Sequence, residues 1–172
     1  MIRIIRQSKM VYAAFLCISF VNVAWGGNMK HVNFWTFVDN MKVNLIKTQD
    51  EMMRSFSNPL LLEHETAHTR FFIGGGFPLQ DGIKIDSVDL RVSKDTAPTP
   101  AFLSFEVSGK CISREDVHKK YKGLVLSGMP TGRSLEETTS FSSNPDEKGL
   151  FVTFSFSEAK PDCLKRVIFD SK

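Results

Sequence analysis

The chain has 172 residues, of which 42% are hydrophobic and 24% charged, proportions that suit a folded domain and exclude a disordered chain. Its lysines and arginines outnumber its aspartates and glutamates by three, and three cations, Arg3, Arg6 and Lys9, lie in the first nine residues. The rest of the chain is electrically neutral, which argues against a nucleic-acid-binding protein.

Residues 1–26 have the pattern of a secretory signal peptide. The three cations precede an uncharged, mostly apolar run of about 15 residues, shorter than the roughly 20 that a membrane-spanning helix needs. Ala24 and Gly26 then place small residues before a cleavage site at Gly27. We therefore expect a mature chain, residues 27–172, that forms a single domain, is periplasmic or secreted, and has no stable membrane span.

Two helices are predicted at the start of the mature chain. Asn33 is a suitable N-cap, and apolar residues follow it at three- and four-residue steps until Asn58-Pro59 interrupts the pattern. A second helix is expected over residues 60–72, where the glycines at 74–76 end it and open a turn.

Alternation with a period of two replaces the helical pattern from residue 83 onward. It predicts a strand over residues 83–92, with a bulge near Asp86-Ser87, and a second strand over residues 103–107. Ser113 and Asp116 have the spacing of a capping box, which predicts a short helix that extends to about Tyr121.

Two strands are predicted near the end of the chain. Residues 150–157 alternate apolar side chains with serine and threonine, and a last strand is centred on residues 167–169. Together the elements predict an α+β fold, with N-terminal helices packed on one side of an antiparallel sheet of about four to five strands, one short additional helix and one disulfide.

The cysteines support export. Cys17 lies in the predicted signal peptide, so the mature chain keeps Cys111 and Cys163. Two cysteines in an oxidising compartment predict one disulfide, which would join the end of the second predicted strand to the start of the last one. The bridge would close a loop of about 53 residues and contribute roughly 4 kcal/mol in the chain-entropy model. Two buried free thiols are the alternative.

Residues 64–68, His-Glu-Thr-Ala-His, resemble the HExxH signature of the zincin metallopeptidases. On a helix, His64 and His68 would lie one turn apart and bind one Zn²⁺, while Glu65 would act as general base on the metal-bound water. The resemblance therefore implies a small secreted zinc peptidase with these three residues as its metal and catalytic site.

The residues after this motif favour a structural role instead. Zincins usually carry a hydrophobic residue where this chain has Arg70, and the metzincin extension has Gly and His where this chain has Phe71 and Gly74. Glu106 is a candidate third ligand without any companion motif. We therefore expect a solvated polar face here, with no metal, no cofactor and no catalytic residue, so the prediction leans away from an enzyme.

Residues 127–149 form the longest irregular stretch, interrupted by a short strand near 139–142. It carries Met129, Arg133 and Phe141, side chains of the kinds that anchor protein interfaces. Long loops in compact domains are usually functional or disordered. These three residues are the predicted partner-binding residues, and Phe151 is predicted to face outward from the sheet.

A small exported domain with one disulfide and no convincing catalytic set predicts a protein-binding module. We expect an inhibitor or immunity-type protein that neutralises an enzyme or toxin in the envelope by surface binding. The alternatives are the zinc metallopeptidase and an envelope or host-facing accessory factor.

Overall fold

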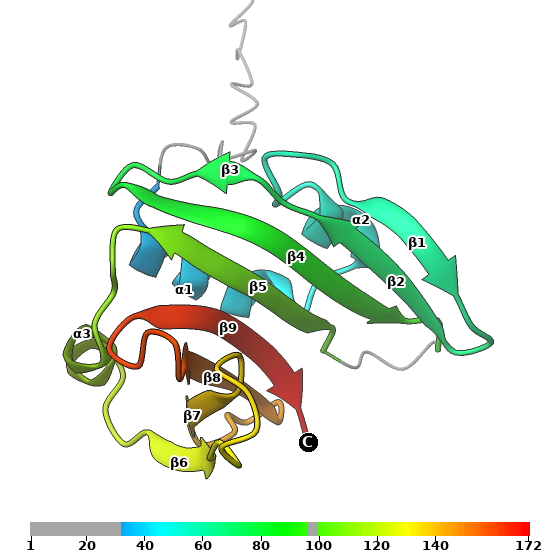
Figure 1. Cartoon of the computed structure of the whole chain (residues 1–172). Helices are drawn as coiled ribbons and strands as arrows, with labels where there is room; N and C mark the ends of the chain where they lie inside the picture. Colours follow the sequence, from blue (N-terminus) through cyan, green and yellow to red (C-terminus); the bar gives the residue numbers. More distant parts are fainter. Residues whose placement is uncertain (1–31, 96–99) are drawn as a thin grey trace, which may run out of the picture.

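A computed structural model of the chain describes residues 32–95 and 100–172, so the predicted signal peptide lies outside the described residues. Nine strands form one antiparallel sheet in the order β1-β2-β4-β5-β9-β8-β7-β6, and β3 pairs with β4 (Figure 1). Strands contain 43% of the described residues and helices 17%. The architecture is therefore dominated by the sheet.

The helices are short: α1 (Phe34–Asn44), α2 (Gln49–Met53) and α3 (Arg114–Lys120). The strands are β1 (Leu61–Glu65), β2 (Thr69–Gly74), β3 (Phe77–Pro78), β4 (Ile83–Ser93), β5 (Phe102–Gly109), β6 (Val125–Gly128), β7 (Thr138–Ser142), β8 (Leu150–Ser157) and β9 (Leu164–Ser171).

Apart from the short β3, the sheet consists of two four-stranded meanders, each of which follows a helix in the chain. The first meander is β1-β2-β4-β5 and the second is β6-β7-β8-β9. Their last strands, β5 and β9, pair antiparallel at the centre of the sheet, where Leu103 lies opposite Phe169. Consequently the first strand of each meander, β1 or β6, lies at an edge of the sheet.

The predicted α+β fold, with N-terminal helices packed on one side of a smaller sheet, is wrong. Residues 60–72, which were expected to be helical, instead contribute β1 and most of β2 to a hairpin in which Leu61 lies opposite Ile73 and Leu62 opposite Phe72. The Thr66 hydroxyl accepts hydrogen bonds from the backbone N–H groups of residues 68 and 69, at 3.3 and 3.1 Å, and so closes the turn. The apolar residues of this stretch lie in two short runs, one at each end of a polar centre. Two paired strands accommodate such runs better than a single face of one helix does.

The first predicted helix is shorter than its apolar pattern suggests. At its start, Asn33 accepts a hydrogen bond from the backbone N–H of Thr36, and Asp81 accepts one from that of Phe34, both at 2.9 Å. The helix α1 ends at Asn44, and Thr48 begins α2 with a separate capping box. The Thr48 side chain accepts a hydrogen bond from the backbone N–H of Glu51, an arrangement typical of a helix start. One continuous helix is therefore replaced by two.

The core lies between the helices and one face of the sheet, which we call the inner face; the opposite face is the outer face. The ring of Phe37 on α1 lies 5.2 Å from that of Phe105 on β5 and 5.6 Å from that of Phe77. All three are buried. Burial of each such side chain contributes about 1.5–3 kcal/mol, so this cluster holds α1 firmly against the sheet.

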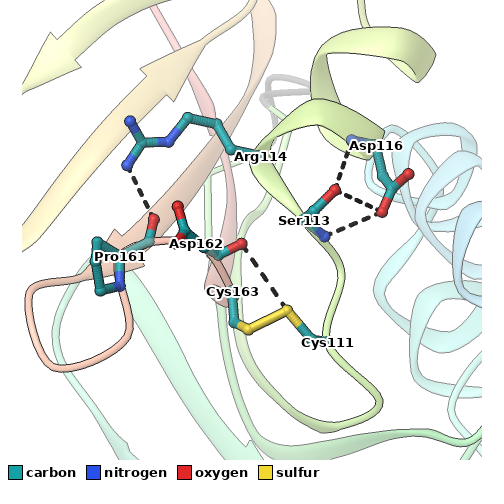
Figure 2. The surroundings of a disulfide bond; sticks show 7 residues. All are labelled: Cys111, Ser113, Arg114, Asp116, Pro161, Asp162 and Cys163. Carbon is teal, nitrogen blue, oxygen red and sulfur yellow. Dashed lines mark hydrogen bonds between the residues drawn. A yellow bond between two sulfur atoms is a disulfide. The ribbon is translucent and has the colours of Figure 1, made fainter.

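The predicted bulge in β4 and the predicted start of α3 are both confirmed. A register shift between Ile85 and Val88 is the expected bulge, and it leaves both of these residues in the core. A capping box between Ser113 and Asp116 begins α3, as predicted (Figure 2).

The disulfide is also confirmed. Cys111 follows β5 and is bonded to Cys163, which directly precedes β9 (Figure 2). Beside the bridge, the backbone N–H of Leu164 donates to the carbonyl of Ile112 at 2.9 Å. The bridge therefore fastens the two meanders together next to the pair of strands that they share.

Candidate functional site

The HExxH residues lie on the β1–β2 hairpin, so the helix that a zincin site needs is absent from this stretch. His64 and Glu65 are consecutive strand residues and therefore point to opposite faces of the sheet, while His68 lies in the turn. The ring of His64 stacks on that of Phe71 with a centroid distance of 4.2 Å. The helical geometry expected for this motif is wrong, because the pattern that suggested it belongs to a hairpin.

The carboxylate of Glu65 has basic neighbours rather than a metal-binding partner. It lies 3.5 Å from the Arg70 guanidinium and 3.5 Å from the Lys94 ammonium, while His68 lies 3.9 Å from Asp95. Within residues 32–95 and 100–172, no three His, Cys, Asp or Glu side chains gather as a metal site would require. Absence of a cofactor remains a prediction.

The stretch predicted to be irregular is largely a β-hairpin. The predicted short strand is present as β7, and β6, which the sequence pattern did not indicate, pairs with it. Residues 129–137 connect the two strands, and we call them the β6–β7 loop. Met129 and Arg133, two of the predicted binding residues, both lie on this loop.

The carboxylate of Glu137 fastens the β6–β7 loop from within. It accepts hydrogen bonds from the Thr131 hydroxyl at 2.8 Å, from the N–H of Gly132 at 3.0 Å and from that of Arg133 at 3.2 Å, and also from the N–H of Thr131. Gly132 has a φ of +81°, a left-handed conformation that glycine adopts without strain. The hydrogen bond from the Thr131 hydroxyl, together with those from the backbone, holds the pKa of the Glu137 carboxyl below its usual range.

The end of the loop is attached to the neighbouring turn between β8 and β9. The backbone N–H of Ala159 donates to the carbonyl of Leu135, and that of Glu158 donates to the carbonyl of Glu137, both at 3.0 Å. Cys163 ends the same turn, so the disulfide lies a few residues from the point of attachment. The loop is therefore held from within by the Glu137 carboxylate and at its end by the turn between β8 and β9.

Apolar side chains project from this loop and from the adjoining strand. The exposed fractions are 72% for Met129 and 68% for Leu135 on the loop, and 53% for Val125 and 52% for Leu126 on β6. Arg133 is exposed as well. We call the three loop residues, Met129, Arg133 and Leu135, the β6–β7 surface. Exposure is the property that sequence reasoning missed for Val125, Leu126 and Leu135.

Phe141, the third predicted binding residue, lies apart from this surface. It is a half-buried residue of β7, with its ring 5.1 Å from that of His118 and 6.2 Å from that of Phe156. The guanidinium of Arg114 lies 5.5 Å from the ring centre. Phe141 therefore packs between the sheet and α3, and its role in binding a partner stays a prediction.

The outer face has a groove of about 650 Å³ across β1, β2, β4, β5 and β9. Arg91 forms an ion pair with Asp89 at 2.7 Å, and Arg166 forms one with Glu106 at 2.5 Å. The hydrogen bond from Arg166 holds the pKa of the Glu106 carboxyl below its usual range. The groove is therefore lined by mutually neutralised charges.

Aromatic side chains also reach the outer face. Arg91 lies over the ring of Phe102 at 4.5 Å and over that of Phe71 at 5.6 Å, and Lys172 lies 5.8 Å from the ring of Phe151. Phe102 lies opposite Arg91 in the sheet, and Phe151 lies opposite Asp170. Phe151 is half-buried on this face. These contacts between basic and aromatic side chains form only when the strands pair, so the sequence alone does not indicate them.

Comparison of the chain with protein-family models, with curated proteins and with solved structures finds no match. Among the described residues, no helix is long and apolar enough to cross a membrane. The geometry of the β6–β7 surface and the disulfide therefore carry the functional argument.

Proposed function

We propose that this chain is an exported protein-binding module and that the β6–β7 surface is its principal contact. The observation that carries the proposal is the attachment of the loop by Glu137, which fixes the backbone from which Met129 and Leu135 project. Exposed apolar side chains on a fixed loop are typical of a contact surface, because ordering the loop on binding costs little free energy.

The kinds of side chain on this surface also favour a protein as the partner. Methionine and arginine are enriched in protein interfaces, and Met129 and Arg133 are exposed on the same loop. Three exposed side chains within seven residues of this loop, two apolar and one arginine, offer both apolar and charged contacts. A protein surface fits such a projection better than a small molecule, which binds in concave pockets.

Within this proposal, the chain is an inhibitor or immunity-type protein of the bacterial envelope. The disulfide is compatible with a periplasmic or secreted location, because such bonds persist in oxidising compartments. A loop that projects from a rigid sheet suits insertion into the cleft of an enzyme or toxin. The partner would then lose activity because the loop occupies its substrate site.

Capture of the partner and calorimetry with surface variants test this proposal. The mature chain, residues 27–172, is used to isolate its partner from the source cell, and the affinity is then measured for wild type, Met129→Ala and Leu135→Ala. We expect a loss of about 2 kcal/mol or more, roughly thirtyfold in affinity, for at least one of these variants.

Leu61→Ala is the matched control for these variants. Leu61 is 68% exposed, like Leu135, but it lies on β1 at the opposite edge of the sheet. Circular dichroism of each variant verifies the fold. Equal affinity of Met129→Ala, Leu135→Ala and the control for the partner would refute the proposed surface.

A further inference from the structure

The free edge of β6 has unused backbone hydrogen-bonding capacity. In the described part of the chain, β6 pairs with β7 on one side and with no strand on the other. Such an edge presents backbone N–H and C=O groups in the geometry that another strand requires. Val125 and Leu126 on this edge are each more than half exposed.

Each face of the sheet has one exposed apolar side chain at this edge. Val125 lies opposite Ser142, whose hydroxyl bonds with that of Thr153 on the outer face, whereas Leu126 lies opposite Phe141 on the inner face. An occupant that covers both side chains and satisfies the backbone must itself be an extended strand with apolar residues on both faces. A helix or a loop would leave the backbone groups unpaired.

The sequence around β6 lacks the charges that normally protect an edge. Residues 123–132, Gly-Leu-Val-Leu-Ser-Gly-Met-Pro-Thr-Gly, contain no acidic or basic side chain. The other edge strand, β1, carries Glu63, His64 and Glu65 within its five residues. Natural proteins use charged residues to prevent pairing between edges, so the β1 edge is protected and the β6 edge is open.

We propose that β6 pairs antiparallel with β6 of a second copy of this chain, across a two-fold axis. The segment is compatible with its own copy, because no charge in residues 123–132 meets a like charge when the two segments run antiparallel. Each copy also supplies the apolar strand that the other requires. Such a pair joins the two sheets into one.

The assembly closes at two copies. Pairing through β6 leaves one β1 strand at each end of the joined sheet. If two β1 strands met antiparallel about Glu63, this glutamate would face its own copy, and like charges directly opposite each other destabilise a sheet. The difference between the two edges thus permits a dimer and opposes a fibre.

Sedimentation of the mature chain over a concentration series tests the proposal without any partner protein. We expect a dimer for wild type, and at least about a tenfold rise in its dissociation constant for Leu126→Lys or Val125→Lys, which place like charges across the axis. Leu62→Lys is the matched control, because Leu62 is 53% exposed on β1, and it should remain dimeric.

Amide hydrogen exchange provides a test without substitution. The amides of residues 125–128 should exchange more slowly at concentrations where the dimer forms than after dilution. A wild-type chain that stays monomeric at its highest soluble concentration would overturn the proposal, as would folded Leu126→Lys and Val125→Lys variants with undiminished association. A monomer that pairs β6 with a foreign strand would equally overturn it.

This test and the test of the proposed function have separate outcomes. Self-association is measured on the chain alone, whereas the proposed function is measured as affinity for a captured partner. A monomeric Leu126→Lys chain that still binds the partner would leave both statements standing. A dimer whose partner affinity is unaffected by Met129→Ala and Leu135→Ala would support the dimer alone.

Discussion

The two halves of the sheet have the same order of elements but differ at their outer edges. In each half a helix precedes a four-stranded meander, and the last strands of the two meanders pair at the centre. The N-terminal half ends in β1, which carries Glu63 and Glu65. The C-terminal half ends in β6, which is uncharged and adjoins the β6–β7 loop. The shared centre therefore maintains the fold, and the C-terminal edge is available for contacts.

The largest effect should come from the centre, where the halves share one core. Phe105 is 1% exposed and packs against Phe37 of α1 and opposite Val167 of β9. We expect Phe105→Ala to lower the free energy of unfolding by about 3–5 kcal/mol, because the cavity affects both halves. Urea unfolding, followed by fluorescence and circular dichroism, gives this value.

Phe141→Ala is the comparison for this variant. Phe141 is half-buried and belongs to the C-terminal half alone, so its removal should cost less. Separate unfolding transitions for the two halves, or a greater loss for Phe141→Ala than for Phe105→Ala, would contradict a shared core.

The disulfide should give the next largest effect, because it fastens the two halves together. We expect the double variant Cys111→Ser/Cys163→Ser to lose about 2–4 kcal/mol of unfolding free energy, since the unfolded chain gains conformational freedom. Thermal unfolding of the oxidised wild type and of this variant measures the difference. An unchanged midpoint would show that the bridge does not constrain the halves.

Removal of the charges at the β1 edge should have a small effect on stability and a visible effect on association. We expect Glu63→Thr/Glu65→Thr to change the unfolding free energy by about 1 kcal/mol or less, because exposed ion pairs contribute little. Light scattering should nevertheless show species larger than those of wild type, since both edges are then open to pairing. An unchanged size distribution would show that these charges do not prevent pairing at the β1 edge.

Much of the sheet is predictable where one strand has two different faces. In β8, Val152, Phe154 and Phe156 are buried in the core while serine and threonine alternate with them, so a period of two is visible in the sequence. The bulge in β4 and the capping box of α3 are likewise local patterns. These features need no knowledge of which strands pair.

The hairpin of β1 and β2 was not predictable in the same way. Its apolar residues form two short runs around a polar centre, and such runs satisfy a helix and a hairpin about equally in the sequence. The hairpin is selected by pairs such as Leu61 with Ile73, which lie twelve positions apart.

The candidate surface was predictable only in part. Met129 and Arg133 are predicted by residue type in a long loop, and both lie on the β6–β7 loop. The role of Glu137 depends on a turn that brings its carboxylate to three backbone N–H groups, and no sequence spacing indicates that turn. Exposure of Leu135 depends equally on where the loop is attached.

The smallest expected change in stability comes from Glu137, although it acts on the region that the proposed function requires. Its pKa lies below the ordinary value of 4.5, so the hydrogen bonds that it accepts are present above that pH and are lost as the pH falls through the lowered pKa. Glu137→Gln should leave global unfolding nearly unchanged, because the carboxylate is exposed. It should loosen the loop at neutral pH, as acid does in wild type.

Amide hydrogen exchange of the β6–β7 loop in the free protein tests the central claim most directly, because the claim requires the loop to be ordered before any partner binds. At pH 6, the amides of Thr131, Gly132 and Arg133 should be protected in wild type, and Glu137→Gln should remove that protection while β5 and β9 retain theirs. Rapid exchange of all three amides in the wild-type protein would contradict the account.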